Sequence, residues 1–268
     1  MRRKKRRRSK ALKAARYVFI TGASSGIGAA LARHYAARGA ILGLAARRGE
    51  ALLTLATELD TACHLYPLDV ADAAALQIAG ADFIAKAGVP DIVIANAGVS
   101  VGTLTEESED LPAFRRVFEI NVLGMVHTFQ PFVAAMRRQG RGRLVGIASV
   151  AGIRGLPGAG AYSASKAAAI SYLESLRVEL RGTGVKVVTL APGYIATPMT
   201  EKNPYPMPFL MPVDDAAASM ARHIERASRF AVMPWPMSIV AAAMKFLPRP
   251  LYDWLAYRAG RKPRGTLR

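Results

Sequence analysis

The sequence contains a single cysteine, Cys63, among 268 residues. One thiol excludes an intramolecular disulfide and a zinc site built from several cysteines. The histidines also lack a typical metal-ligand spacing such as i, i+4. They are His34, His64, His127 and His223. We therefore expect no metal ion, and the cysteine content is compatible with a reducing compartment.

Long apolar runs are missing as well. Near the C-terminus, the longest stretch without a charged residue, Phe230–Met244, has 15 residues and contains Pro234 and Pro236. A helix that spans a bilayer needs about 20 predominantly apolar residues. The N-terminus has no apolar stretch like that of a secretory signal, although its arginine-rich, acid-free composition also occurs in organellar transit peptides. We expect a cytoplasmic protein without a transmembrane helix.

Acidic residues are absent from one end of the chain and scarce at the other. Residues 1–16 hold ten Lys and Arg and no acid, and residues 245–268 hold seven against Asp253. Residues 17–244 hold 20 basic and 18 acidic side chains, so nearly all of the net charge of +18 lies in the two tails. We predict that residues 1–16 are disordered, because no apolar face offsets the entropy of ordering them. This basic tail is then either a solvated solubility segment or a contact for anionic lipid or nucleic acid.

Between the tails, short apolar runs alternate with longer segments of helical periodicity. The short runs predict strands at Tyr17–Thr21, Ala40–Ala45, His64–Pro67, Asp91–Ala95, Gly142–Ile147, Val185–Leu190 and Arg229–Met233. The longer segments predict helices at Ile27–Arg38, Arg48–Leu59, Ala71–Ala87, Leu111–Arg138, Tyr162–Leu180 and Val213–Ala227. This alternation is typical of repeated βα units. We therefore predict an α/β protein with a doubly wound parallel sheet in three αβα layers.

The chain has no internal repeat and no flexible linker that would divide its core. Its length suits a single α/β domain, which we assign to residues 17–233. An apolar and basic C-terminal extension follows at 234–268, and we expect it to be helical over Ile239–Leu247 and Leu251–Tyr257.

The first predicted strand runs directly into a glycine-rich turn, Thr21–Gly28, and a helical pattern starts at once. Such a turn lets the backbone approach a pyrophosphate, which the free N–H groups of the helix N-terminus bind. An ordinary tight loop is the alternative. Dinucleotide-binding folds place an acid about 20 residues further on, but here the second strand leads into Arg47 and Arg48. A guanidinium there would pair with a 2′-phosphate and favours NADPH over NADH, whereas Arg48 alone would suit a solvated charge.

Ser149, Tyr162 and Lys166 form a second pattern. Tyr162 and Lys166 are four residues apart in a predicted helix, so the phenol and the ammonium share one face. A nearby cation favours the phenolate and lowers the pKa of a tyrosine from its ordinary value of about 10. The pair is therefore a candidate proton donor. Without the glycine turn, an ordinary amphipathic helix would explain it better.

The joint pattern closely resembles the short-chain dehydrogenase/reductase superfamily in its compact single-domain form, over about residues 17–200. The matching motifs occur in the family's order and spacing. They are Thr21–Gly28, Leu68 to Val70, Asn96 to Gly98, Asn121, Ser149, Tyr162 with Lys166, and Pro192 to Ile195 with Thr197. The resemblance implies a Rossmann fold and a hydride transfer between the nicotinamide of NADP(H) and an alcohol or carbonyl carbon.

The same resemblance implies four catalytic residues. Tyr162 would be the acid–base, and Lys166 would lower its pKa and hold the nicotinamide ribose. Ser149 would hydrogen-bond the substrate oxygen. Asn121 would retain a water that relays protons to solvent.

The resemblance also implies how the cofactor is bound. Asp69 would accept a hydrogen bond from the adenine amino group, Asn96 would flank the adenosine ribose, and residues 192–197 would bind the carboxamide and the diphosphate. NADP-preferring members often carry a basic residue before the second glycine, but Ser25 stands there, so the preference rests mainly on Arg47. The full predicted cofactor set is Gly22, Ser24, Ser25, Gly26, Ile27, Gly28, Arg47, Asp69, Val70, Asn96, Ala97, Gly98, Tyr162, Lys166, Pro192, Gly193, Ile195 and Thr197.

Two segments bear on the substrate and on partners. Thr200–Pro212 stands where the family carries its substrate lid, and its apolar side chains would either line a pocket or pack the lid on the core. They are Tyr205, Met207, Phe209, Leu210 and Met211. We expect a lipophilic ketone, aldehyde or 3-oxoacyl compound, and catalysis in the reductive direction.

The short glycine-containing terminal strand that builds tetramers in many compact members is missing. A basic segment with Trp and Tyr takes its place and resembles interfacial helices. It would either attach the protein peripherally to the inner face of the membrane or cover the core or a dimer partner. The resemblance also implies a homo-oligomer, either a dimer or a tetramer.

Two other functions compete with a reductase. A catalytically silent nucleotide-sensing or scaffolding protein could keep the same fold, but the intact set of Asn121, Ser149, Tyr162 and Lys166 argues against it. A nucleic-acid-binding protein would use the basic tails, but the core is nearly neutral and has no recognisable reading motif. We therefore do not expect a nucleic acid partner.

Overall fold

The computed structural model describes residues 16–201, 203, 206–258 and 260–265. The disorder predicted for residues 1–16 lies outside the described residues, except at Arg16. The Arg16 N–H donates to an Asp91 carboxylate oxygen at 2.9 Å, and its carbonyl accepts the Ile41 N–H at 2.8 Å. Arg16 thus contacts the domain predicted for residues 17–233.

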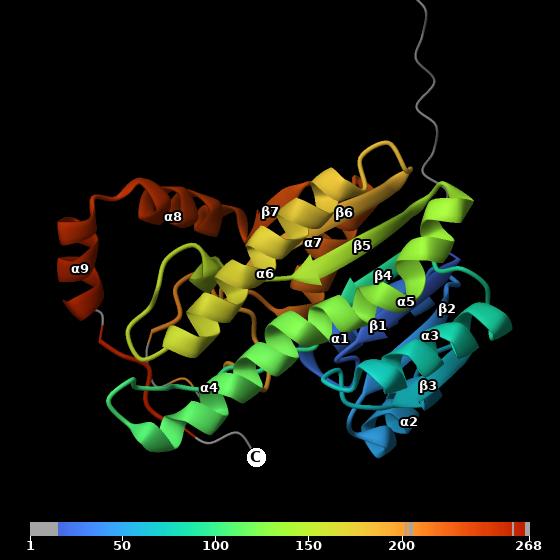
Figure 1. Ribbon diagram of the computed structural model, residues 1–268, viewed down its shortest axis with the longest axis horizontal. Coiled ribbons are helices and arrows are strands. Elements are labelled where there is room, and N and C mark those ends of the chain that lie inside the picture. The colour runs from blue at the N-terminus through green and yellow to red at the C-terminus, as the bar shows by residue number, and fades with distance from the viewer. Residues whose placement is uncertain (1–15, 202, 204–205, 259, 266–268) are drawn as a thin grey trace, which may run out of the picture.

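The centre of the molecule is a seven-stranded sheet with the order β3-β2-β1-β4-β5-β6-β7, in which every neighbouring pair is parallel (Figure 1). The strands are β1 Tyr17–Thr21, β2 Ile41–Ala46, β3 Cys63–Pro67, β4 Ile92–Ala95, β5 Gly142–Ile147, β6 Val185–Pro192 and β7 Phe230–Met233. The order reverses at β1, from which the chain builds outward in both directions. This confirms the doubly wound parallel sheet, with strand ends shifted by one or two residues.

Helices cover both faces of the sheet (Figure 1). Those of the domain are α1 Gly26–Ala36, α2 Gly49–Thr57, α3 Ala73–Lys86, α4 Leu111–Phe118, α5 Gly124–Gln139, α6 Gly160–Glu179 and α7 Val213–Glu225. Side chains of α1, α2 and α7 form one buried cluster with Val18 and Ile20 of β1, and those of α3, α5 and α6 form a second with Phe19. Because successive strand residues point to opposite faces, the apolar run Val18–Ile20 of β1 supplies both clusters.

The single helix predicted over Leu111–Arg138 is wrong. Between α4 and α5 lies a π-helical turn, η2 (Glu119–Leu123). A π turn adds a residue to the helical turn and so offsets the faces on its two sides. As a result, α4 packs against α6, whereas α5 packs against α3.

The C-terminal extension forms two helices, α8 (Trp235–Phe246) and α9 (Arg249–Arg258), each of which starts earlier than predicted. Pro236 and Pro250 lie in the first turns, where a missing N–H costs no helical hydrogen bond. Helix α8 buries Met237 and Ala241 and packs against β7, but α9 buries no side chain. Of the described residues, none belongs to a helix long and apolar enough to cross a membrane.

Candidate active site

The glycine turn joins β1 to α1 at the carboxyl edge of the sheet. Gly22 and Gly26 have positive φ angles of 65° and 53°. A Cβ atom on Gly22 would lie 2.7 Å from the Ala97 Cα atom, so only glycine fits there. Ser25 precedes α1 without a side-chain cap, which leaves the N–H groups of the first turn available to an anion such as a pyrophosphate.

Two arginines lie beside this turn, after β2. The Arg48 guanidinium donates to the hydroxyl oxygens of Ser24 and Ser25, at 3.2 Å and 3.0 Å. Arg47 lines the same cavity. The structure thus brings Arg48 as well as Arg47 to the place where an acid would bind a ribose hydroxyl.

Asp69 follows β3 at the same edge. One carboxylate oxygen accepts the Ala71 N–H at 3.0 Å, and the other forms an ion pair with Arg116 of α4. Both oxygens already have a partner, so an adenine amino group would share the carboxylate with Arg116. Arg116 stands 47 residues along the chain, and no motif in the sequence signals this contact.

The residues after β4 hold the glycine turn in place. The side-chain amide of Asn96 donates to the carbonyl oxygens of Thr21 and Gly22, at 3.0 Å and 3.1 Å. Its backbone N–H donates to the Thr21 hydroxyl at 3.3 Å. Asn96 therefore ties β4 to the turn.

The Tyr162 phenol projects from the first turns of α6 into the cavity and hydrogen-bonds the Ser149 side chain. Ser149 comes directly after β5, and its hydroxyl oxygen also accepts the Ala151 N–H at 3.1 Å. Burial raises the pKa of Tyr162, and the hydrogen bond with Ser149 lowers it. The phenol is therefore protonated at neutral pH and is able to donate.

Lys166 lies one helical turn after Tyr162 and is 4% exposed. Its Nζ atom donates to the Ile147 carbonyl at 2.9 Å and lies 5.8 Å from the centroid of the Tyr162 ring. Burial lowers its pKa to about 8. Lys166 thus brings a positive charge close to the phenol, without a carboxylate partner among the described residues.

Asn121 lies in the π-helical turn η2 and is 1% exposed. Its side-chain oxygen accepts the Val99 N–H at 2.8 Å, and its amide donates to the Val99 carbonyl and to the Ser165 hydroxyl, both at 3.0 Å. Asn121 therefore connects the loop after β4 to helix α6, next to Lys166.

One cavity of about 320 Å³ joins these elements. Every predicted site residue lines it except Gly28 and Asn121, which lie behind its wall. A Cβ atom on Gly28 would come within 2.2 Å of the Gly22 carbonyl oxygen, so Gly28 allows the turn to close on α1. The glycine turn and the uncapped helix end fit the pyrophosphate of a dinucleotide.

The described residues of the predicted lid contribute little to this cavity. Thr200 lines it, but Phe209 and Leu210 are 51% and 45% exposed and neither line the cavity nor pack on the core. Tyr205 lies outside the described residues. In the part of the chain that the structure describes, no group of three or more His, Cys, Asp or Glu side chains is placed to hold a metal ion.

Residues 16–206 match the family of short chain dehydrogenases. The chain belongs to the short-chain dehydrogenase/reductase superfamily. The protein is thus an oxidoreductase of this family with a Rossmann fold and a nicotinamide cofactor.

Individual relatives support the assignment. An uncharacterised oxidoreductase of Myxococcus xanthus is 41% identical over 248 residues, which cover 91% of this chain and 97% of that protein. The 2-dehydro-3-deoxy-L-rhamnonate dehydrogenase (NAD(+)) of a Sphingomonas species is 38% identical, over 71% of this chain and 76% of its own. The crystal structure of a short-chain dehydrogenase from Streptomyces avermitilis superimposes with a TM-score of 0.77 at 26% identity, covering 91% of this chain and 98% of that one.

The buried ammonium of Lys166 predicts a pH-dependent stability. The pKa of Lys166 is about 8 in the folded protein and about 10.4 in an unfolded chain. Between these pH values the unfolded state binds more protons than the folded state. The free energy of unfolding, compared with that of Lys166→Met, therefore rises by about 3 kcal/mol as the pH increases. Urea unfolding of both proteins at pH 7 and pH 10 measures this change. Stability curves that stay parallel over this range would contradict it.

Proposed function

We propose that the protein is an NADP(H)-dependent reductase that transfers a hydride to the carbonyl carbon of a lipophilic small molecule. The observation that carries this proposal is the meeting of Ser149, Tyr162 and Lys166 with the glycine turn in one cavity. An ordinary structural role would not require a buried lysine that lies beside a tyrosine and has no ion-pair partner among the described residues.

In the proposed reaction, the protein orients the carbonyl and supplies its proton. The Ser149 hydroxyl hydrogen-bonds the carbonyl oxygen, and the Tyr162 O–H donates its proton to that oxygen. When bound, NADPH supplies the hydride that the carbonyl carbon accepts. The C=O double bond thus becomes a C–H and an O–H bond, and Tyr162 is left as a phenolate.

Lys166 and Asn121 support this proton transfer. The Lys166 ammonium, 5.8 Å from the ring centroid, stabilises the phenolate that forms. Asn121 holds the loop after β4 against α6, and we propose that it also retains a water through which Tyr162 is reprotonated. The low dielectric of the cavity strengthens these interactions.

A preference for NADPH follows from the charges at the adenosine end. Arg47 and Arg48 line the cavity, and Arg48 lies over the hydroxyls of Ser24 and Ser25. Guanidinium groups bind phosphate in a bidentate manner and with a full charge. The apolar side chains of Val99, Ile147, Ile195 and Met199 along the cavity support a lipophilic substrate.

The C-terminal helices support a second proposal, a peripheral contact with an anionic membrane. Trp235, Phe246, Trp254 and Tyr257 are 74%, 80%, 51% and 87% exposed. Basic residues lie between and beside these aromatic side chains: Lys245, Arg249, Arg258 and Arg261. Aromatic and basic side chains together suit the headgroup region of a bilayer. Alternatively, the same side chains of α8 and α9 would contact a second subunit in the expected homo-oligomer.

Replacement of Tyr162 tests the proposed reaction. Tyr162→Phe removes the proton donor, and we expect the rate of NADPH-dependent reduction of medium-chain ketones, aldehydes and 3-oxoacyl thioesters to fall about 100-fold to 10,000-fold. Fluorescence titration should show that the variant still binds NADPH. Tyr172→Phe, on the same helix outside the cavity, is the control. Binding of NADPH without reduction of any compound would favour the silent scaffold instead.

Replacement of either arginine tests the cofactor preference. Arg47→Ala and Arg48→Ala should each raise the dissociation constant of NADPH about tenfold or more and leave that of NADH nearly unchanged, because only NADPH carries the 2′-phosphate. Arg138→Ala removes an equal charge from an exposed position at the end of α5 and serves as the control. The preference would be disproved if the unchanged protein bound NADH more tightly.

Flotation with vesicles tests the membrane contact. We expect binding to vesicles with anionic lipid, loss of binding at high salt, and at least about tenfold weaker binding for the double variant Phe246→Ala/Trp254→Ala. Leu53→Ala/Ile78→Ala removes two exposed apolar side chains elsewhere and should bind normally. If the C-terminal variant instead turns a dimer into a monomer, the face is a subunit interface.

A further inference from the structure

The end of the described chain returns to the active site. We call residues 260–265 the C-terminal strap. It passes between the loop after β4 and the loop that leads into α6 (Figure 1). The Lys262 N–H donates to the Pro157 carbonyl at 3.0 Å, and the Gly265 N–H donates to the Gly102 carbonyl at 3.3 Å.

Two glycines let the C-terminal strap approach these loops closely. A Cβ atom on Gly102 would lie 1.9 Å from the Pro263 carbonyl oxygen, and one on Gly158 would lie 2.3 Å from that of Lys262. Side chains at these positions would displace the C-terminal strap. Its path therefore depends on the local sequence of both loops.

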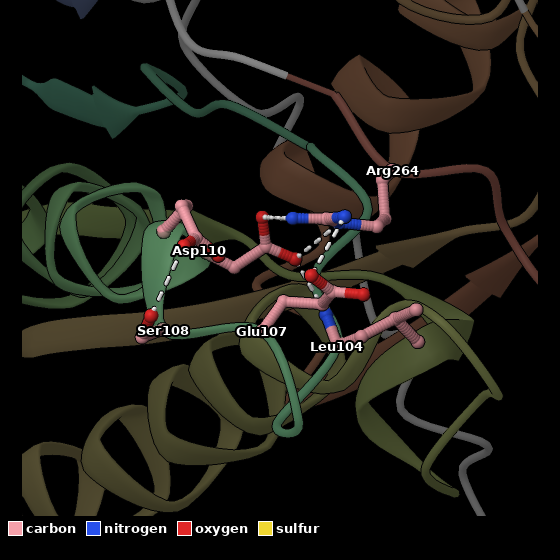
Figure 2. A network of polar contacts seen from close by, with 6 residues as sticks. Leu104, Glu107, Ser108, Asp110 and Arg264 are labelled. Atoms are coloured by element: carbon pink, nitrogen blue, oxygen red, sulfur yellow. Dashed lines mark hydrogen bonds and ion pairs between the residues drawn. The ribbon is translucent and has the colours of Figure 1, made fainter.

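Arg264 anchors the C-terminal strap to the domain (Figure 2). Its guanidinium donates to both carboxylate oxygens of Asp110, at 3.0 Å to 3.3 Å, and forms an ion pair of 3.0 Å with Glu107. Asp110 is only 8% exposed and also accepts the Leu104 N–H at 2.8 Å. The guanidinium holds the pKa of Asp110 below its ordinary value. A bidentate pair of this kind fixes the position of Lys262, two residues earlier.

Lys262 carries a half-buried ammonium next to Tyr162. Its Nζ atom donates to the Ser100 hydroxyl at 2.6 Å and lies 5.7 Å from the centroid of the Tyr162 ring. Ser100 follows Val99, which lines the cavity. The ammonium therefore lies close to the ring of Tyr162, the residue that lines the cavity and would protonate the carbonyl.

The Lys262 ammonium has no ion-pair partner among the described residues. Two acids of the segment after β4, Glu107 and Asp110, are engaged by Arg264. An ammonium has three donors, and among the described residues only one of them has a protein acceptor. A partly buried cation with free donors gains most from an anion.

We propose that Lys262 binds a carboxylate of the substrate, so that the preferred substrate is a lipophilic oxo acid. The proposal rests on the proposed function, in which Tyr162 protonates the carbonyl. Lys262 would select among carbonyl compounds and take no part in the hydride or proton transfer. Arg264 is then a positioning residue, because it holds Lys262 through the C-terminal strap.

Pairs of substrates with and without a carboxylate distinguish carboxylate binding by Lys262 from a general effect of Lys262 on catalysis. The probes are medium-chain oxo acids, in which the ketone is moved stepwise along the chain, and the methyl ester of each acid. For the unchanged protein we expect a higher kcat/KM for at least one acid than for its ester. In Lys262→Gln this kcat/KM should fall about 10-fold to 100-fold, mainly through KM, and that of the ester should stay within about twofold. Lys262→Arg keeps the charge and should retain part of the preference.

Two further variants test the geometry. Arg261→Gln removes an exposed charge from the same C-terminal strap and should leave the ratio of acid to ester unchanged. Arg264→Gln should lower the ratio without changing the affinity for NADPH. Thermal unfolding of each variant shows whether the domain is intact.

The proposal is overturned if the unchanged protein reduces the esters as well as the acids. It is also overturned if Lys262→Gln slows both classes equally, since Lys262 would then act on Tyr162 rather than on the substrate. A failure of the proposed function has a different signature: NADPH does not bind, or Tyr162→Phe is as active as the unchanged protein on every compound.

Discussion

All parts of the active site depend on the parallel alignment of the strands. Because the strands point the same way, the residues that follow β1, β2, β3, β4, β5 and β6 meet at one edge of the sheet. Hydrogen bonds continue beyond the strands: the Ala148 N–H donates to the Leu190 carbonyl at 2.7 Å, and the Gly193 N–H donates to the Met233 carbonyl at 2.8 Å. The side-chain amide of Asn96 likewise connects the end of β4 to the glycine turn by hydrogen bonds. Hydrogen bonds therefore extend from the sheet into the cavity wall.

The charges around this wall are unevenly distributed. Asp69 is the one acidic side chain among the described residues that line the cavity, and Arg116 already neutralises it. Among the described residues, Lys166 has no carboxylate partner that would compensate its charge. Its lowered pKa reflects the cost of burying an ammonium. The buried charge lowers the stability of the folded domain. Burial of the two apolar clusters on either side of the sheet offsets this cost.

Features governed by local periodicity could be predicted from the sequence. The strands, the glycine turn and the i, i+4 pair of Tyr162 and Lys166 each follow from a few neighbouring residues. Contacts between distant residues could not be predicted. Arg264 meets Asp110 across 154 positions, and α9 carries aromatic and aliphatic side chains but buries none of them. The broken helix was missed because α4 and α5 are both amphipathic, and only their different neighbours require a π turn between them.

That π turn has a genetic consequence. Each residue of an α-helix advances its face by about 100°. The extra residue in Glu119–Leu123 therefore keeps the faces of α4 and α5 out of step, and Asn121 occupies the widened turn. Deletion of any one codon in this stretch would bring the two faces into step and rotate α4 away from α6. Point substitutions on the exposed side of the same turn would leave that phase unchanged, so the length of this segment is under tighter constraint than its composition.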